Sequence, residues 1–137
     1  MSYAIGAALQ TAVYLRLLAD PEVSAQVGTA IFDAPPTGNI PATYVSIGPE
    51  SVRDRSDISG HGAEHRFTVS VVTEEAGFGA AKLLAGAISD ALTDAEISLT
   101  RGRLVGLWFE RATAQRTGKA GRARRIDLTF RARVEDN

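Results

Sequence analysis

Cysteine is absent from the 137 residues of the chain, and long apolar runs are absent as well. The lack of cysteine excludes disulfide frameworks, thiolate metal sites and thiol catalysis, and it suits a reducing compartment. No apolar run approaches the roughly 18 residues of a membrane span, and residues 2–18 lack the cationic start of a secretory signal. The sequence therefore predicts a soluble cytoplasmic protein with one domain over residues 1–137.

Motifs of enzyme chemistry and of cofactor binding are also scarce. No serine stands in a Gly-x-Ser-x-Gly turn, and the serines do not cluster with either histidine. The Gly77–Gly79 turn is similar to a dinucleotide-binding turn, but Lys82 occupies the third glycine position and the flanking strands are predicted to be antiparallel. His61 and His65 have the spacing of metal ligands on a helix, yet they fall at the start of a predicted strand. We predict that the chain is not an enzyme and uses no cofactor or metal.

The chain does have charge of opposite sign in two parts. Residues 1–100 contain five Lys/Arg and twelve Asp/Glu, a net −7, whereas residues 101–137 contain ten and four, a net +6. Opposite charges on two surfaces suit copies that pack side to side in a ring, or one end that meets an acidic partner. Ordinary solvated faces would carry the same residues, so the charges alone leave these interpretations open.

The hydrophobic period changes from two to 3.6 in the middle of the chain. Residues 66–73 alternate apolar and polar side chains, which predicts a half-buried strand. Residues 80–92 place apolar side chains three and four apart, which predicts an amphipathic helix with Leu83, Leu84 and Ile88 in its stripe. Half of this stripe is alanine, so the helix can lie close against the apolar face of the strand.

The remaining segments complete an α+β pattern. Further elements are predicted at residues 2–19 and 21–27 (helices), 29–32 and 43–47 (strands) and 105–134 (one long hairpin). The sequence therefore predicts an α+β fold, with a single antiparallel β-sheet, two main α-helices packed on one face and long hairpin loops. The inward residues of the sheet are predicted to be Val45, Ile47, Phe67, Val69, Val71, Val105, Leu107, Phe109, Ile126, Leu128 and Phe130.

Residues 48–62 have little to bury, and they are predicted to form a long polar loop or hairpin tip. A loop of this length without its own core is usually functional or disordered. We expect this loop to contact a neighbouring protein through its mixed charges. The candidate residues are Arg53, Asp54, Arg55 and Asp57.

Residues 115–125 are predicted to form a flexible basic tip of the last hairpin, because they contain glycines and no large apolar residue. The simplest recipient is an acidic protein surface; nucleic-acid phosphates compete with it, and a solvated loop is the third interpretation. No aromatic residue interleaves with the cations, so we do not expect sequence-specific reading of a nucleic acid. The candidate residues are Arg116, Lys119, Arg122, Arg124 and Arg125.

Taken in order, these segments resemble the small tail-terminator or tail-completion proteins in the neck of long-tailed phages and gene transfer agents. The resemblance spans nearly the whole chain and includes no catalytic signature. It rests on the order and spacing of five stretches of ordinary residue types. They are Leu17-Leu18-Ala19-Asp20, Ile31-Phe32-Asp33-Ala34-Pro35-Pro36, residues 41–48, the strand-to-helix segment 67–92, and Leu128-Thr129-Phe130-Arg131-Ala132-Arg133-Val134.

The resemblance implies a structural virion protein of the tail or neck, assembled in the cytoplasm of a host bacterium. Its copies would form a ring, expected to be a hexamer, on the last ring of the major tail tube protein. There the ring would stop tube growth and offer a surface to the head-side connector or stopper protein. DNA would pass through the lumen without sequence-specific binding, and no membrane would be involved. The family shares no active site, so the resemblance transfers no functional residue.

Three other functions stay open at this stage. Another neck protein, such as a head-closure ring, would assemble in a similar way. A basic nucleic-acid-binding module would instead bind DNA as a monomer, with a strong dependence on salt. Small-molecule catalysis would need a concave polar pocket, which the sequence does not indicate.

Overall fold

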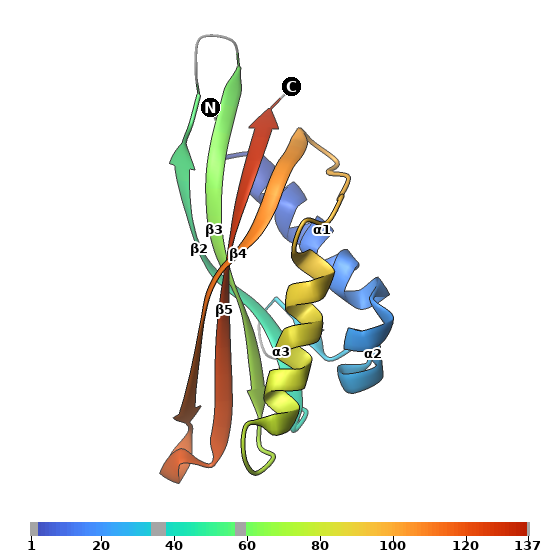
Figure 1. The fold of residues 1–137 in the computed structure, drawn as a ribbon, viewed down its shortest axis with the longest axis vertical. Helices are drawn as coiled ribbons and strands as arrows, with labels where there is room; N and C mark the ends of the chain where they lie inside the picture. Colours follow the sequence, from blue (N-terminus) through green and yellow to red (C-terminus); the bar gives the residue numbers. More distant parts are fainter. Residues whose placement is uncertain (1–2, 34–37, 57–59, 137) are drawn as a thin grey trace.

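The computed structural model describes residues 3–33, 38–56 and 60–136, which form one twisted five-stranded sheet with three α-helices on one face (Figure 1). The strand order is β1-β2-β3-β5-β4. In this described part of the chain, the opposite face of the sheet carries no helix. The elements are α1 (Ile5–Ala19), α2 (Pro21–Val27), β1 (Ile31–Phe32), β2 (Thr43–Asp54), β3 (His61–Thr73), α3 (Gly79–Leu92), β4 (Arg103–Thr117) and β5 (Ala123–Asp136).

The sheet is mixed, so the prediction of a purely antiparallel sheet was wrong. β1 pairs in parallel with β2, with Ile31 opposite Val45, whereas the other three pairings are antiparallel. Residues 33–42 separate β1 from β2, and only a connection longer than a hairpin turn lets a chain return to the same end of a sheet. Hydrophobic alternation does not encode strand direction, so the parallel pairing of the two-residue strand β1 could not be predicted from the sequence. The α+β class, with α1 and α3 as its main helices, is confirmed.

The core lies between the helices and the inner face of β2, β3 and β5. Leu84 and Ile88 of α3 are buried as predicted, but Leu83 is 71% exposed. The buried stripe of α3 includes Ala81 and Ala85 instead, because successive residues on a helix point about 100° apart and the helix is rotated away from Leu83. The confirmed inward residues of the sheet are Val45, Ile47, Phe67, Val69, Val71, Leu107, Ile126, Leu128 and Phe130.

β4 departs from the predicted burial at Val105 and at Phe109. Its register with β5 shifts twice, and each bulge sets an extra residue in one strand and re-aims the side chains next to it. Val105, at the first bulge, is 46% exposed and Phe109 is 43% exposed, so their prediction as core residues was wrong. Phe109 keeps the alternation, since it lies opposite Phe130 and packs against its ring, but it stands on an edge strand. β4 is also the last strand of the sheet, beyond the strands that α3 mainly covers.

The segment predicted as a polar loop at residues 48–62 consists largely of paired strands. β2 continues to Asp54, and β3 begins at His61. A register shift after Ile47 interrupts the alternation that would have indicated a strand. Past the shift, backbone pairing holds the hairpin, and Val52 packs on a small second cluster of buried side chains. The described residues of this segment are therefore mostly two paired strands rather than a loop.

β4 and β5 also extend the last hairpin further than predicted. The segment at residues 115–125 is strand at both ends, and Arg116 lies opposite Arg124 in the ladder. A short 3₁₀ turn, Lys119–Gly121, closes the hairpin. The ladder needs only backbone N–H and C=O groups, so a strand can continue where the sequence has no apolar alternation.

Asp20 connects α1 to α2 and is expected to stabilise the start of α2. Its carboxylate accepts a hydrogen bond from the backbone N–H of Val23 at 3.0 Å, and Pro21 occupies the first helical position. Asp20→Ala should lower the free energy of unfolding by about 1 kcal/mol in a denaturant melt. Asp20→Asn keeps an acceptor and should stay near the parent value. Equal losses in the two variants would contradict the capping role.

Candidate assembly surfaces

The tips of the two long hairpins lie at opposite ends of the sheet (Figure 1). β3 begins at His61 opposite Asp136, near the end of β5, and it finishes at Thr73 opposite Arg124, near the start of β5. The described outer end of the β2–β3 hairpin, residues 53–56 and 60–61, is called the β2–β3 tip below; it lies at one end of the sheet and the β4–β5 tip lies at the other. Each tip carries one of the two charged groups that the sequence indicated, so the candidate surfaces are separate.

The β4–β5 tip, residues 116–122, presents three unpaired cations and is called the basic tip below. Arg116, Lys119 and Arg122 are exposed, and none has an ion pair within the described residues. Gly118 enters the turn with φ at +77°, a backbone conformation that glycine adopts without steric cost. The three charges are free to meet acidic groups of another molecule.

The other two cations of the predicted cluster are held by the fold. Arg124 Nη1 donates to two backbone carbonyl oxygens of the basic tip, at 3.2 and 3.1 Å, and its guanidinium lies 5.8 Å from the Phe78 ring centroid. Arg125 Nε donates to Asp127 Oδ1 at 2.9 Å, and its Nη2 donates to Ser70 Oγ at 3.2 Å. Arg124 and Arg125 therefore stabilise the hairpin. The candidate contact residues at this tip are Arg116, Lys119 and Arg122.

The β2–β3 tip exposes two further cations without partners. Arg53 and Arg55 are exposed and have no ion pair in the part of the chain that the structure describes. Asp54 is engaged locally, because the Ser56 hydroxyl (2.6 Å) and backbone N–H (3.0 Å) donate to its carboxylate and hold its pKa below the ordinary value. Asp57, the fourth candidate, lies outside the described residues.

The sheet face away from the helices includes Trp108, which the sequence analysis did not single out. Trp108 is 38% exposed, and the Arg131 guanidinium lies 4.9 Å from its ring centroid. The ring also covers Gly106, where an added Cβ would come within 2.4 Å of it. Arg131 lies opposite Trp108 in the ladder of β4 and β5. The single tryptophan of the chain, two residues after a glycine, could have been noted in the sequence. Its partner Arg131 could be identified only from the register of β4 and β5.

A hollow of about 520 Å³ lies beside the first part of β4 and is called the acidic hollow below. The chain after α3 forms one wall, where the Asp94 backbone N–H donates to the carbonyl oxygen of Leu107 at 3.1 Å. Asp94 and Glu96 are exposed on this wall, and neither has an ion pair within the described residues. Val105 and Trp108 add partly exposed apolar surface. This hollow could not be predicted from the sequence because two separate segments of the chain build it.

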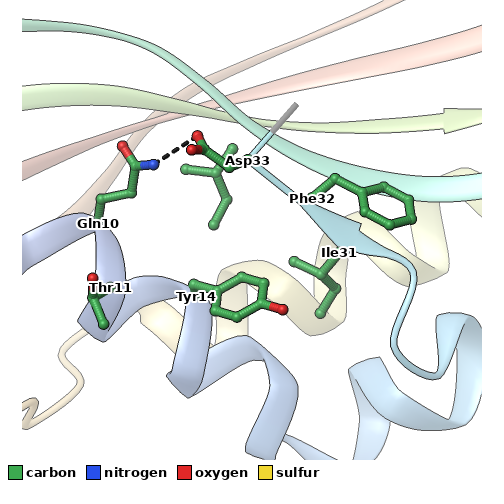
Figure 2. A pocket seen from close by; sticks show the side chains of 7 residues that line it. Gln10, Thr11, Tyr14, Ile31, Phe32 and Asp33 are labelled. Carbon is green, nitrogen blue, oxygen red and sulfur yellow. Dashed lines mark hydrogen bonds between the residues drawn. The ribbon is translucent and has the colours of Figure 1, made fainter. Parts of the chain in front are cut away.

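A second hollow, of about 370 Å³, lies between α1 and β1, toward the opposite edge of the sheet (Figure 2). Tyr14, Ile31 and Phe32 give it an apolar lining. Gln10 Nε2 donates to Asp33 Oδ1 at 2.6 Å, so the carboxylate at its rim already has a partner. Its lining pairs no nucleophile with a base, and the hollow suits a contact rather than a reaction.

The two histidines have different environments. His61 is exposed at the start of β3, whereas His65 is buried with its Nδ1 3.5 Å from Glu50 Oε2 and its ring stacked on Tyr3 at 6.4 Å between centroids. The Tyr3 hydroxyl also donates to Glu50, and this hydrogen bond raises the pKa of Tyr3. In the described ranges, no group of three His, Cys, Asp or Glu could hold a metal ion, and no helix is long and apolar enough to span a membrane.

The described surface has projecting charged tips and open hollows, which suit contacts with other macromolecules. The family model of tail completion protein gp17 matches residues 11–135, and the chain belongs to this family. It is therefore a structural virion protein and not an enzyme, as the sequence analysis predicted.

The fold closely matches a solved chain of a gene transfer agent virion. That chain comes from a structure described as "Virion of native gene transfer agent (GTA) particle", and the match has a TM-score of 0.92. The two sequences are 58% identical, over 98% of this chain and 99% of that chain. No curated protein sequence matches the chain.

Proposed function

We propose that the chain completes the tail of a particle of the gene transfer agent type. The observation that carries the proposal is the 58% identity, along nearly the full length of both chains, to a component of a native gene transfer agent virion. In this function, copies form a ring, a hexamer as the family resemblance implies, on the last ring of the tail tube protein. The ring ends tube growth and joins the tail to the head-side connector or stopper protein.

The two separate hairpin tips and the opposite net charges of the two parts of the chain support a ring. A head-to-tail ring needs two different surfaces on each copy, and the chain has separate tips and a net charge of −7 in residues 1–100 against +6 in residues 101–137. The particle would assemble in the cytoplasm of a host bacterium. DNA would cross the lumen without sequence-specific binding, because contacts of cations with phosphates carry no sequence information.

Removal of the chain from the producing cells tests this function. Electron microscopy should then show tail tubes of excessive and irregular length that are not joined to heads, and gene transfer should stop. Tubes of normal length joined to heads would contradict the proposal. Tubes of normal length that remain unjoined would instead identify a head-closure ring, the second candidate in the same class.

We assign the β2–β3 tip to a contact with a neighbouring copy or with the tail tube protein. Arg53→Glu combined with Arg55→Glu should leave the melting midpoint nearly unchanged, because both side chains are exposed and unpaired. Like charges that meet across an interface cost several kcal/mol, so gene transfer should fall by more than about tenfold. Deletion of residues 52–59 would be a poorer test, since it removes paired strand residues.

Lys82→Glu provides the control for this pair. Lys82 is an exposed cation in the first turn of α3, at the opposite end of β3 from Arg53 and Arg55, and its change should leave a contact at the β2–β3 tip intact. Normal particle titres from the Arg53 and Arg55 double variant would show that this tip is not a contact surface. A titre equally low in the Lys82 control would show that any loss of charge harms the particle.

A further inference from the structure

The basic tip stands far from the acidic hollow of its own chain. The hollow lies beside Leu104–Trp108, whereas the tip follows Thr117, at the other end of β4. Ten residues of strand from Leu107 to Thr117 span about 33 Å. In Figure 1, the hairpin tip and the segment after α3 accordingly lie at opposite ends of the molecule. One chain cannot bring the two surfaces together.

The two surfaces complement each other in charge. Arg116, Lys119 and Arg122 have no ion pair in the described residues, and the same holds for Asp94 and Glu96. The residues that line the acidic hollow include no lysine or arginine. Three cations on a projecting turn and two carboxylates at a recess are therefore left without local partners.

The shapes are complementary as well. The turn that closes the hairpin contains Gly118, Ala120 and Gly121, so its backbone is narrow and its cations extend from a slender arm. The acidic hollow measures about 520 Å³ and is open to the surface, which gives room for such a turn. Partly exposed Val105 and Trp108 offer apolar contact to the stems of the arginine and lysine side chains.

We propose that the basic tip of one copy docks in the acidic hollow of the next copy. The inference rests on the proposed ring function and names the surfaces through which neighbouring copies meet. Because the two surfaces lie at opposite ends of the sheet, each copy uses its tip on one neighbour and its hollow on the other. This is the head-to-tail arrangement from which closed rings are built. Exposed ion pairs are screened by salt, so the contact weakens as ionic strength rises.

The hollow between α1 and β1 is a poorer recipient for the tip. Its lining is largely apolar, and its one carboxylate, Asp33, already accepts a hydrogen bond from Gln10. The basic tip brings no large apolar side chain to fill such a lining. Charge complementarity therefore selects the acidic hollow.

Cysteine cross-linking tests the contact directly, since the chain has no cysteine of its own. Ser98 is exposed at the acidic hollow and Ala120 is exposed on the basic tip, so Ser98→Cys and Ala120→Cys add thiols without changing a charge. A disulfide needs Cα atoms within about 7 Å, a condition that the distance along β4 excludes within one chain. Oxidation of particles that contain the double variant should yield a ladder of linked copies on a non-reducing gel.

Ser98→Cys with Ser56→Cys is the matched control, because Ser56 is an exposed serine on the other hairpin tip. Neither this pair nor the two single variants should give a ladder. If the tested pair gives none in particles whose tails end normally, the inference is overturned while the proposed ring function stands. If removal of the chain leaves tails normal, the proposed function itself fails.

Charge reversal gives a second test and separates a protein contact from a DNA contact. Arg116→Glu combined with Lys119→Glu and Arg122→Glu should prevent assembly and leave tail tubes uncapped. Asp94→Arg combined with Glu96→Arg should have the same effect alone and should restore capped tubes when it is combined with the reversed tip. Capped tubes of normal length that fail only in DNA delivery would assign the tip to DNA and overturn the inference.

Discussion

Phe130→Ala should lower the free energy of unfolding by about 3–5 kcal/mol, the cost of a fully buried phenylalanine. The ring has no exposed surface, and it lies at the centre of an aromatic row that crosses three strands. Phe67 stacks on it at 5.7 Å between centroids, and Phe109 meets it edge-on at 6.0 Å. A single domain is stable by roughly 5–15 kcal/mol, so this one change removes a large fraction.

Phe109→Ala is the matched control in the same row. Its ring is 43% exposed on the edge strand, so removal should cost about 1–2 kcal/mol. The two variants are to be compared by denaturant midpoint at a shared slope, since a changed slope reports altered compactness. Equal losses would mean that helices cover β4 as well as β5, and a loss near zero for Phe130→Ala would mean that the strand faces are reversed.

The sequence predicted the central strands well, because one face of each is buried and the other is solvated. A slip of one residue would exchange the two faces of a strand, so the alternation around Phe67 and Phe130 determines which of their side chains face the core. The same reasoning placed Leu84 and Ile88 of α3 in the core. Where burial on one face is strong, local pattern and tertiary packing carry the same information.

The sequence was less informative where backbone hydrogen bonds alone hold a strand. The outer ends of both hairpins bury little, and their pairing depends on N–H and C=O groups that every residue has. β1 does bury Ile31, but its alternation carries no information on strand direction. The bulges on either side of Leu107 likewise change side-chain direction without a mark in the composition. The first bulge explains why Val105 was placed inside, whereas Phe109 faces the same side as Phe130 and is exposed because the helices leave the edge strand uncovered.

The charged surfaces could be predicted in part. The cluster of cations near the last hairpin was evident in the sequence, but its division into free and engaged members was not. Arg125 is engaged because strand pairing brings Ser70 beside Asp127, a relation between residues that are far apart in the chain. The acidic hollow could not be predicted for the same reason, since only the fold brings Glu96 and Trp108 to one hollow.

Gly102→Ala should be the most damaging of the glycine changes, with a loss of roughly 2–5 kcal/mol. Gly102 has φ at +73°, which costs a residue with a Cβ about 1–2 kcal/mol. An added Cβ would also lie 2.6 Å from the carbonyl oxygen of Glu135 and 2.7 Å from Ile5 Cδ1. Ile5 is fully buried and Glu135 is held in the β-ladder, so neither can withdraw easily, and such overpacking typically costs a further 1–3 kcal/mol, roughly.

Gly77→Ala separates the two contributions, because Gly77 has φ at +75° but no heavy atom within 4 Å of an added Cβ. Its backbone strain is partly offset by the lower entropy that alanine gives the unfolded chain, so a loss of about 1 kcal/mol or less is expected. The difference between the two denaturant midpoints therefore measures how tightly Gly102 packs between the start of α1 and the end of β5. If both variants lose the same free energy, that junction is loose, and α1 must be anchored elsewhere along its length.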